Sequence, residues 1–196
     1  MKLPAFYPIL DAVAGVGAAE ALLQAGAKII QFRHKGFFSR REFEAAERIS
    51  QLCRSAGALF IVNDRADIAK LLDTGLHLGQ DDLTPKDARR IVSGETIVGF
   101  STHNEQQLRA GDLEPVDYLA IGPIFATTSK QNPDPVVGLD RLRALRTLTK
   151  KPLVAIGGIT LESAPQVFEA GADSVAIISG LRARAEDWVA ICQSRR

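Results

Sequence analysis

The chain has 196 residues, of which 46% are hydrophobic and 24% charged, and its formal net charge is +1. This composition predicts a soluble globular protein with one sizeable core, organised as a single domain over residues 1–196. The near-neutral charge, with no basic block beyond Arg195 and Arg196, excludes the electrostatic footprint of a protein that binds nucleic acid or an anionic membrane.

The two cysteines, Cys53 and Cys192, lie far apart in the sequence. They lack the paired spacing of a zinc site or a disulfide framework, which favours a reducing compartment. The first residues, Met1 to Ala5, lead into an apolar strand without a signal-like apolar core, and no apolar run reaches membrane-spanning length. We therefore expect a cytoplasmic protein without a membrane segment.

Short apolar runs alternate with longer helical patterns along the whole chain, which indicates parallel βα units rather than hairpins. Three predicted helices end in Ala-Gly-Ala, which puts Gly26, Gly57 and Gly171 where a left-handed C-cap residue belongs. Eight compact units fit an α/β fold closed into a (β/α)8 TIM barrel better than an open, doubly wound sheet. The predicted strands are Phe6 to Leu10, Lys28 to Phe32, Leu59 to Val62, Leu76 to Leu78, Ile97 to Phe100, Tyr118 to Ile121, Leu153 to Ile156 and Ser174 to Ile178.

The second predicted strand leads into a basic segment, Gln31-Phe32-Arg33-His34-Lys35. Residues two apart in a strand share a face, so Gln31, Arg33 and Lys35 project together. A guanidinium, an ammonium and an amide at one strand end suit a diphosphate group. The alternative is an exposed basic strand end that binds no anion.

Carboxylates follow the next two predicted strands, with Asp64 after the third and Asp81 and Asp82 after the fourth. In barrels of this kind the chemistry collects on loops at the carboxyl ends of the strands. Mg²⁺ usually takes one or two carboxylates together with phosphate oxygens, so Asp64 and either Asp81 or Asp82 could share one ion. Helix capping stays open as the alternative, because Asp64 precedes a helix and the other two lead towards Thr84-Pro85.

The remaining predicted loops supply hydroxyl groups, a lysine and glycines. The fifth carries Ser101-Thr102-His103, and the long sixth loop, Gly122 to Gly138, carries Thr127-Thr128-Ser129-Lys130. Turns before helices and a solvated surface loop are the alternatives for these two. Gly157-Gly158 and Ser179-Gly180 follow the last two strands. Such loops with a helix N-terminus form the recurring phosphate site of these barrels, so we favour phosphate binding here.

The histidines and two adjacent aromatic residues are harder to assign. His77 lies within a short strand and His34 between two cations, so both are expected to be packed or partly exposed rings. Phe37 and Phe38 line the pocket or a lid, or cover the helical layer. No triad of Ser, His and Asp is required by the sequence.

Taken in order, these segments resemble thiamine-phosphate synthase over nearly the whole chain, from Tyr7 to Ser179. The resemblance implies coupling of hydroxymethylpyrimidine diphosphate to a thiazole phosphate or its carboxylate, giving thiamine phosphate and pyrophosphate with Mg²⁺. By resemblance, the pyrimidine diphosphate contacts are Gln31, Arg33, Lys35, Asn63 and Lys130, with Ser101 beside the ring. The implied metal ligands are Asp64 and Asp82. The implied thiazole phosphate cradle is Thr127, Ser129, Gly158, Ile178 and Ser179, with Thr128 also among the substrate contacts.

The implied reaction needs no protein nucleophile. Electron release from an aminopyrimidine supports a benzylic-type cation, so the protein's task is to stabilise departing pyrophosphate and to align the thiazole nitrogen. Arg33, Lys35 and Lys130 would neutralise the leaving charge together with Mg²⁺, and Ser101 completes the implied catalytic set.

Several positions depart from the commonest family pattern. Phe32 replaces a usual leucine, His34 stands where an acidic residue is frequent, and Ser129 replaces a usual threonine. Phe37-Phe38 stands where the family has a polar loop. These departures concern pocket shape and affinity more than the class of reaction.

Two other functions remain open at this stage. The related thiazole tautomerase tends to carry an acid-base histidine where this chain has Pro123, and it usually lacks the full diphosphate and metal set. A non-catalytic regulator that binds thiazole phosphate would keep Gly158 and Ser179 and could lose the metal ligands. The expected partners are the two small substrates, without nucleic acid or membrane. A homo-oligomer is left open, because no sequence feature assigns an interface.

Overall fold

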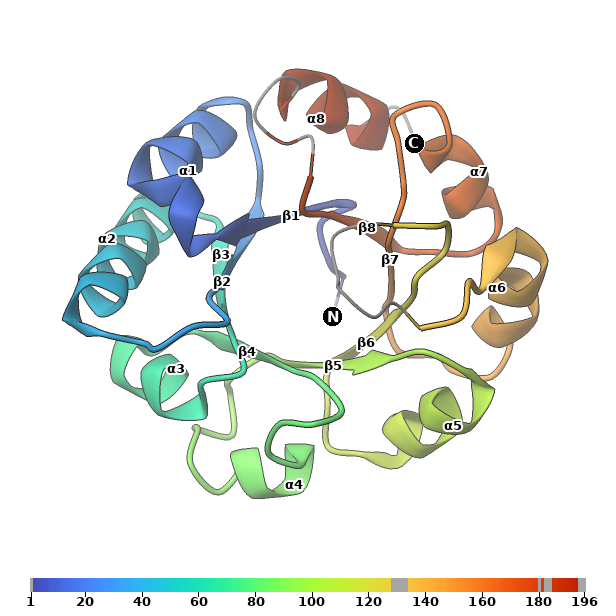
Figure 1. Ribbon diagram of the computed structural model, residues 1–196, viewed down its shortest axis with the longest axis horizontal. Coiled ribbons are helices and arrows are strands. Elements are labelled where there is room, and N and C mark those ends of the chain that lie inside the picture. Colours follow the sequence, from blue (N-terminus) through green and yellow to red (C-terminus); the bar gives the residue numbers. More distant parts are fainter. Residues whose placement is uncertain (1, 128–133, 180, 182–184, 194–196) are drawn as a thin grey trace.

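The computed structural model describes residues 2–127, 134–179, 181 and 185–193, and the strands within them close into one parallel barrel (Figure 1). Each strand pairs with the next one in the chain, and β8 pairs with β1. The strands are β1 (Phe6–Asp11), β2 (Ile29–Arg33), β3 (Leu59–Asn63), β4 (Gly75–Leu78), β5 (Val98–Thr102), β6 (Tyr118–Ile121), β7 (Leu153–Ile156) and β8 (Ser174–Ile177). The predicted (β/α)8 TIM barrel is confirmed.

The helices form an outer ring around the barrel (Figure 1). They are α1 (Gly15–Gln24), α2 (Arg40–Ser55), α3 (Ala66–Leu72), α4 (Pro85–Ala88), α5 (Glu105–Leu113), α6 (Gly138–Arg146), α7 (Ala164–Glu169) and α8 (Ala185–Gln193), and a 3-10 turn, Ala12–Ala14, precedes α1. The glycines Gly26, Gly57 and Gly171 have φ of +100°, +61° and +103°, which confirms their predicted left-handed conformation at helix ends. No helix in the described ranges is long and apolar enough to cross a membrane.

In six of the eight strands, all but β4 and β5, alternate residues enter two separate apolar clusters. Tyr7, Ile29 and Tyr118 belong to the cluster inside the barrel. Ile30 and many other residues belong to the larger cluster between the strands and the helices. Leu3, only 4% exposed, packs with the inner cluster before β1 begins, and the segment that carries it lies within the ring of strands (Figure 1). The amino-terminal end of the barrel is therefore covered by apolar side chains.

The predicted strand boundaries need correction at six of the eight strands. Those of β6 and β7 are right, whereas β2 and β5 begin one residue later than predicted, β4 begins one residue earlier, and β8 ends one residue earlier. At the carboxyl end, four strands continue past the last apolar residue of their predicted run, to Asp11, Arg33, Asn63 and Thr102. Backbone hydrogen bonds build a strand whatever the side chain, so these polar residues extend it. Arg33, Asn63 and Ser101 therefore lie on the barrel itself and not on loops.

Candidate active site

Two cations lie at the carboxyl end of β2, and each is paired with a carboxylate. Arg33 Nη1 is 3.5 Å from Asp11 Oδ2, at the matching position of β1. Lys35 Nζ donates to Asp64 Oδ2 at 2.5 Å, just beyond the end of β3. The Lys35 side chain is 54% exposed, so its ammonium is accessible to a ligand. Asp11 was not predicted, although it continues the inward-facing alternation of Tyr7 and Ile9.

Gln31 shares the strand face of Arg33, as predicted, but it lies deeper in the barrel, whereas Lys35 lies beyond the end of β2. Its side chain is only 2% exposed, and Nε2 donates to the Tyr7 hydroxyl at 3.1 Å. A residue two positions before Arg33 in a strand lies about 7 Å nearer the middle of the barrel. Gln31 therefore meets a ligand only where that ligand reaches the floor of the site.

Asp64 and Asp82 interact directly. Burial and a hydrogen bond with the Asp82 carboxyl raise the pKa of Asp64 to about 6, while the Lys35 ammonium opposes that rise. Asp82 Oδ2 also accepts a hydrogen bond from the Gly79 amide at 2.7 Å, which fixes its orientation. Asp64 itself has φ of +66°, in the left-handed region.

The capping alternative for these two carboxylates is wrong. The N-cap residue of α3 is Arg65, which makes no side-chain cap. The N-cap of α4 is Thr84, whose hydroxyl accepts from the Asp87 amide at 3.1 Å. Local helix chemistry therefore does not account for Asp64 or Asp82.

The carboxylate pair fits a hard divalent cation. Two ionised carboxylates within hydrogen-bonding reach repel each other, and a cation held by both removes that cost. Mg²⁺ often takes only one or two protein carboxylates and completes its shell with phosphate oxygens and water. In the part of the chain that the structure describes, no group of three or more His, Cys, Asp or Glu side chains could hold a metal. An ion held by Asp64 and Asp82 would thus take its other ligands from substrate or solvent.

Asn63 ends β3 beside this pair. It is 7% exposed, and its Nδ2 is buried without a hydrogen-bond partner in the described ranges. A buried unpaired amide destabilises a protein unless a ligand supplies the acceptor. Asn63 therefore offers a donor next to Asp64, where the sequence places a diphosphate contact.

Ser101 is connected to the barrel interior through His77. The Ser101 Oγ lies 2.9 Å from His77 Nε2, and His77 Nδ1 lies 2.9 Å from the Tyr118 hydroxyl. The Tyr118 hydroxyl in turn lies 2.6 Å from that of Tyr7. Burial lowers the pKa of His77 to about 4, so the ring is neutral near pH 7. His77 is packed, as predicted, but its bond to Ser101 and the roles of both tyrosines were missed.

One sequence signal could have found this arrangement. Gly99 interrupts the fifth strand, and a Cβ there would lie 2.0 Å from Tyr118 Cζ. Only glycine leaves room for the Tyr118 ring to cross the interior at this level. A glycine inside a strand therefore marked a large inward side chain on the neighbouring strand.

The loops after β6 and β7 pack closely against each other. Gly157 and Gly158 have φ of +98° and +66°, and Cβ atoms there would lie 2.6 Å from Pro123 Cβ and 2.5 Å from the Ala126 carbonyl oxygen. These glycines thus allow close contact between two loops, a role additional to the predicted approach to a ligand. Thr127 directly follows Ala126, so the start of the predicted cradle lies beside Gly158.

The rest of the predicted cradle is described only in part. Ile178 is partly buried and Ser179 exposed, directly after β8 and next to the β7 loop. Thr128, Ser129 and Lys130 lie outside the described residues.

The two adjacent phenylalanines take different positions. Phe37 is 88% exposed. Phe38 packs edge-on against Phe32, with ring centroids 6.2 Å apart, and the Arg65 guanidinium lies 5.0 Å from its ring centroid. Phe38 is therefore a partly buried member of the packing around the end of β2, whereas Phe37 is exposed.

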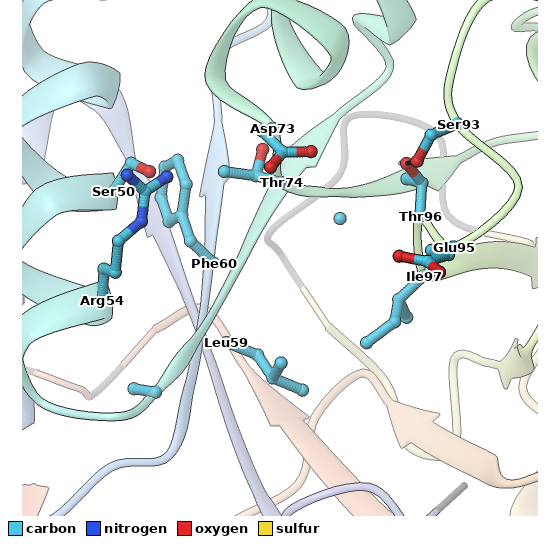
Figure 2. A pocket seen from close by; sticks show the side chains of 12 residues that line it. Ser50, Arg54, Leu59, Phe60, Asp73, Thr74, Ser93, Glu95, Thr96 and Ile97 are labelled. Atoms are coloured by element: carbon cyan, nitrogen blue, oxygen red, sulfur yellow. Dashed lines mark hydrogen bonds between the residues drawn. The ribbon is translucent and has the colours of Figure 1, made fainter.

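Two cavities lie in different parts of the molecule, one along α5 and one at the amino end of the barrel. One of about 370 Å³ is lined by Gly79, Gln80 and Asp82, together with residues of α5. The other, of about 310 Å³, is lined by Arg54 and Ser50 of α2 and by Thr74 and other residues that precede β4 and β5 (Figure 2). None of the predicted site residues lines the second cavity. The predicted site residues that are described thus gather at the carboxyl end, where barrels of this fold carry their chemistry.

Comparison with known proteins gives a consistent result. A family model described as thiamine monophosphate synthase matches residues 6–181. A thiamine-phosphate synthase from Koribacter versatilis (strain Ellin345) is 48% identical, with 99% of this chain and 98% of that protein covered. Another from Chloroflexus aurantiacus is 42% identical, with 90% and 82% covered. The solved structure of thiamine phosphate pyrophosphorylase from Pyrococcus furiosus has a TM-score of 0.87 and 31% identity, covering 97% of this chain and 96% of that one.

Proposed function

The chain belongs to the thiamine monophosphate synthase family, and from this premise we propose the reaction that its barrel performs and the residues that perform it. The protein is a transferase that condenses hydroxymethylpyrimidine diphosphate with a thiazole phosphate, or its carboxylate, to give thiamine phosphate and pyrophosphate. The reaction takes place at the carboxyl end of the strands, with Mg²⁺ as the cofactor. Both substrates carry phosphate charge and do not cross membranes freely, which favours a cytoplasmic enzyme. A homo-oligomer stays a prediction.

The observation that carries this proposal is the cluster of Lys35, Asp64 and Asp82. A cation and two partly buried carboxylates from three successive strand ends suit the handling of a metal-bound diphosphate. A tautomerase that moves one proton on a thiazole phosphate has no use for such a cluster. Where a tautomerase tends to carry an acid-base histidine, after β6, this chain has Pro123, whose side chain has no proton to exchange. A regulator that only binds thiazole phosphate has no use for the cluster either.

The cluster acts on the leaving group. Mg²⁺, when bound, would neutralise charge on the diphosphate oxygens. Lys35 has a flexible stem and an exposed ammonium, so it can turn from Asp64 to a phosphate oxygen as charge develops there. Arg33, on the same face, presents a guanidinium that is already held by Asp11. Asn63 Nδ2 gives a further donor to the diphosphate, and this donor is matched only when the substrate is present.

The remaining roles hold and align the two rings. Ser101 and the deeper Gln31 lie at the floor of the site and contact the pyrimidine ring. Thr127, Gly158, Ile178 and Ser179 hold the thiazole phosphate so that its nitrogen faces the reacting carbon. Thr128, Ser129 and Lys130 enter this proposal through the family resemblance.

The test is product formation from both substrates with and without Mg²⁺. Thiamine phosphate and pyrophosphate are separated by chromatography for the unmodified protein and for an Asp64→Ala, Asp82→Ala double variant. We expect metal-dependent formation of both products and a loss of at least about 1000-fold in the double variant. Asp140→Ala, which removes a carboxylate that is 99% exposed on α6, is the matched control and should keep full activity. Thiazole phosphate binding without product would instead indicate the regulator or the tautomerase.

A further inference from the structure

An unbroken series of hydrogen bonds crosses the barrel interior between two of the proposed pyrimidine contacts. Gln31 Nε2 donates to the Tyr7 hydroxyl at 3.1 Å, and the Tyr7 and Tyr118 hydroxyls lie 2.6 Å apart. The Tyr118 hydroxyl lies 2.9 Å from His77 Nδ1, and His77 Nε2 lies 2.9 Å from Ser101 Oγ. We call these five residues the interior relay. It spans β1, β2, β4, β5 and β6, so no local sequence segment contains it.

Burial makes the direction of these hydrogen bonds matter. Gln31, Tyr7, Tyr118 and His77 are 2%, 1%, 0% and 7% exposed. A buried donor that faces no acceptor is costly, so each hydrogen in the relay must point at an oxygen or nitrogen that can accept it. The donor and acceptor roles in one of the four consecutive hydrogen bonds therefore fix the roles in the next.

The Gln31 amide sets the direction from one end. Its Nε2 can only donate, so the Tyr7 oxygen accepts. The hydrogen of Tyr7 then has the Tyr118 oxygen as its acceptor. The Tyr118 hydroxyl in turn donates a hydrogen bond to His77 Nδ1, which must therefore carry no proton. If Tyr118 donated to Tyr7 instead, the Tyr7 hydrogen would have no acceptor in the relay.

The direction continues to Ser101. A neutral imidazole carries one proton, and with Nδ1 as the acceptor that proton is on Nε2. His77 Nε2 therefore donates to Ser101 Oγ. The hydroxyl hydrogen of Ser101 is then directed away from His77, towards the site, where a ligand can accept it.

Resting on the proposed function, we propose that His77, aligned by Tyr118 and Tyr7, is a positioning residue that makes Ser101 a hydrogen-bond donor to an unprotonated ring nitrogen of the pyrimidine. A ring nitrogen accepts a hydrogen bond, whereas the exocyclic amine of an aminopyrimidine donates one. Ser101 thus selects which edge of the ring faces β5. The ligand class is an aromatic heterocycle that presents a bare nitrogen at that position.

Packing holds the relay in place. The His77 and Tyr118 rings stack with centroids 5.5 Å apart and an interplanar angle of 28°. Gly99 leaves the space in which the Tyr118 ring lies, because a Cβ there would be 2.0 Å from Tyr118 Cζ. The imidazole therefore cannot rotate freely to exchange its two nitrogens.

The direct test is the tautomer of His77, measured on the substrate-free protein by ¹⁵N NMR of labelled histidine. A His34→Gln, His103→Gln double variant leaves His77 as the remaining imidazole. We expect a neutral ring with a bare Nδ1 and a protonated Nε2. A ring protonated on Nδ1 would overturn the proposal, because Ser101 would then donate inwards.

Steady-state kinetics test whether the relay acts on the ligand. Tyr7→Phe removes a hydroxyl three links from Ser101, and we expect a rise of about three- to tenfold in KM for the pyrimidine substrate alone. His77→Leu should cause a larger rise, and His77→Gln, which can still accept from Tyr118 and donate to Ser101, should restore much of it. Val154→Ala, an inner-cluster change outside the relay, is the control for packing.

The outcomes separate the two proposals. Equal changes in KM for both substrates, or no rescue by glutamine, would show a merely structural role for the relay and would overturn this inference. Absence of product in the unmodified protein would overturn the proposed function, while the tautomer measurement would still decide the direction of the relay.

Discussion

Two buried polar atoms in the described part of the chain have no hydrogen-bond partner, and they lie at opposite ends of the barrel. Asn63 Nδ2 is at the carboxyl end of β3, and Thr74 Oγ1 directly precedes β4. Asn63 adjoins Asp64 and so lies beside the ammonium of Lys35. Thr74 lines the cavity in Figure 2, where Arg54 donates to a backbone carbonyl. We therefore take the unpaired atom as a sign of a ligand only at the carboxyl end, where charged side chains are also concentrated.

Substitutions of the two lysines that flank β2 give the largest expected difference in activity between the two ends of the barrel. Lys35→Met removes the ammonium beside Asp64, and kcat/KM should fall by about 100- to 1000-fold, because a charged donor to the leaving group is lost. Lys28→Met is the matched control, since Lys28 Nζ donates to the Ala56 carbonyl at 3.3 Å at the amino end. Its activity should stay within about twofold of the parent, as expected away from the catalytic end. Comparable losses in both variants would remove the functional distinction between the ends.

The stability of the protein in acid should also depend on His77, which lies in the barrel interior beneath the site. The pKa of His77 is lowered from 6.5 to about 4 by burial, with Lys35 adding to the shift and Asp82 opposing it. A folded-state pKa below the unfolded one gives stability that is complete above pH 6.5 and is lost as the pH falls towards 4. The free energy of unfolding should therefore decrease by about 3 kcal/mol over this range on account of His77.

Urea unfolding between pH 4 and pH 8 measures this contribution. His77→Gln keeps hydrogen-bonding groups but cannot titrate, so its stability should vary less with pH than that of the parent. His34→Gln serves as the control, since His34 is a partly exposed ring that meets the Phe37 carbonyl. A parent and a His77→Gln variant with the same acid slope would contradict a buried neutral ring.

The sequence predicted the ends of the barrel better than its interior. The alternation of runs, and glycines such as Gly26, are local signals, and they were enough for the closed barrel. The placement of Lys35 and Asp64 at the same end of the barrel also followed, because the carboxyl ends of all strands in a parallel barrel lie at one end. Four strand ends were placed too early, since the last apolar residue was taken as the limit.

The interior relay could not be read from the sequence in the same way. Tyr7 and Tyr118 are 111 residues apart, and each fits an apolar strand pattern, so their hydroxyls drew no attention. The pairing of Arg33 with Asp11 likewise depends on the register between β1 and β2. Register and inward packing are tertiary properties, and only Gly99 carried a local trace of them.

Asn63→Leu tests the carboxyl-end member of the unpaired atoms. Leucine has a similar shape but no donor, so kcat/KM should fall by about 10- to 100-fold if Nδ2 binds an anionic oxygen. The free energy of unfolding should stay the same or rise by about 1 kcal/mol, because the unpaired buried amide is removed. Thermal unfolding with and without the pyrimidine substrate separates the two effects. Full activity in this variant would show that Asn63 is not a ligand contact.

Thr74→Val tests the amino-end member and gives the smallest expected effect. Valine keeps the shape and removes the unpaired hydroxyl, so the protein should gain up to about 1 kcal/mol of stability without change in activity. Thr96→Val, in the same cavity, should have the opposite sign, because the Thr96 hydroxyl is 3.1 Å from Ser93 Oγ and that partner would be left unpaired. Urea unfolding of both variants measures the difference. Equal destabilisation by the two substitutions would mean that the Thr74 hydroxyl has a hydrogen-bond partner in the cavity. The buried polar atoms at the two ends would then differ in hydrogen bonding as well as in the charge that surrounds them.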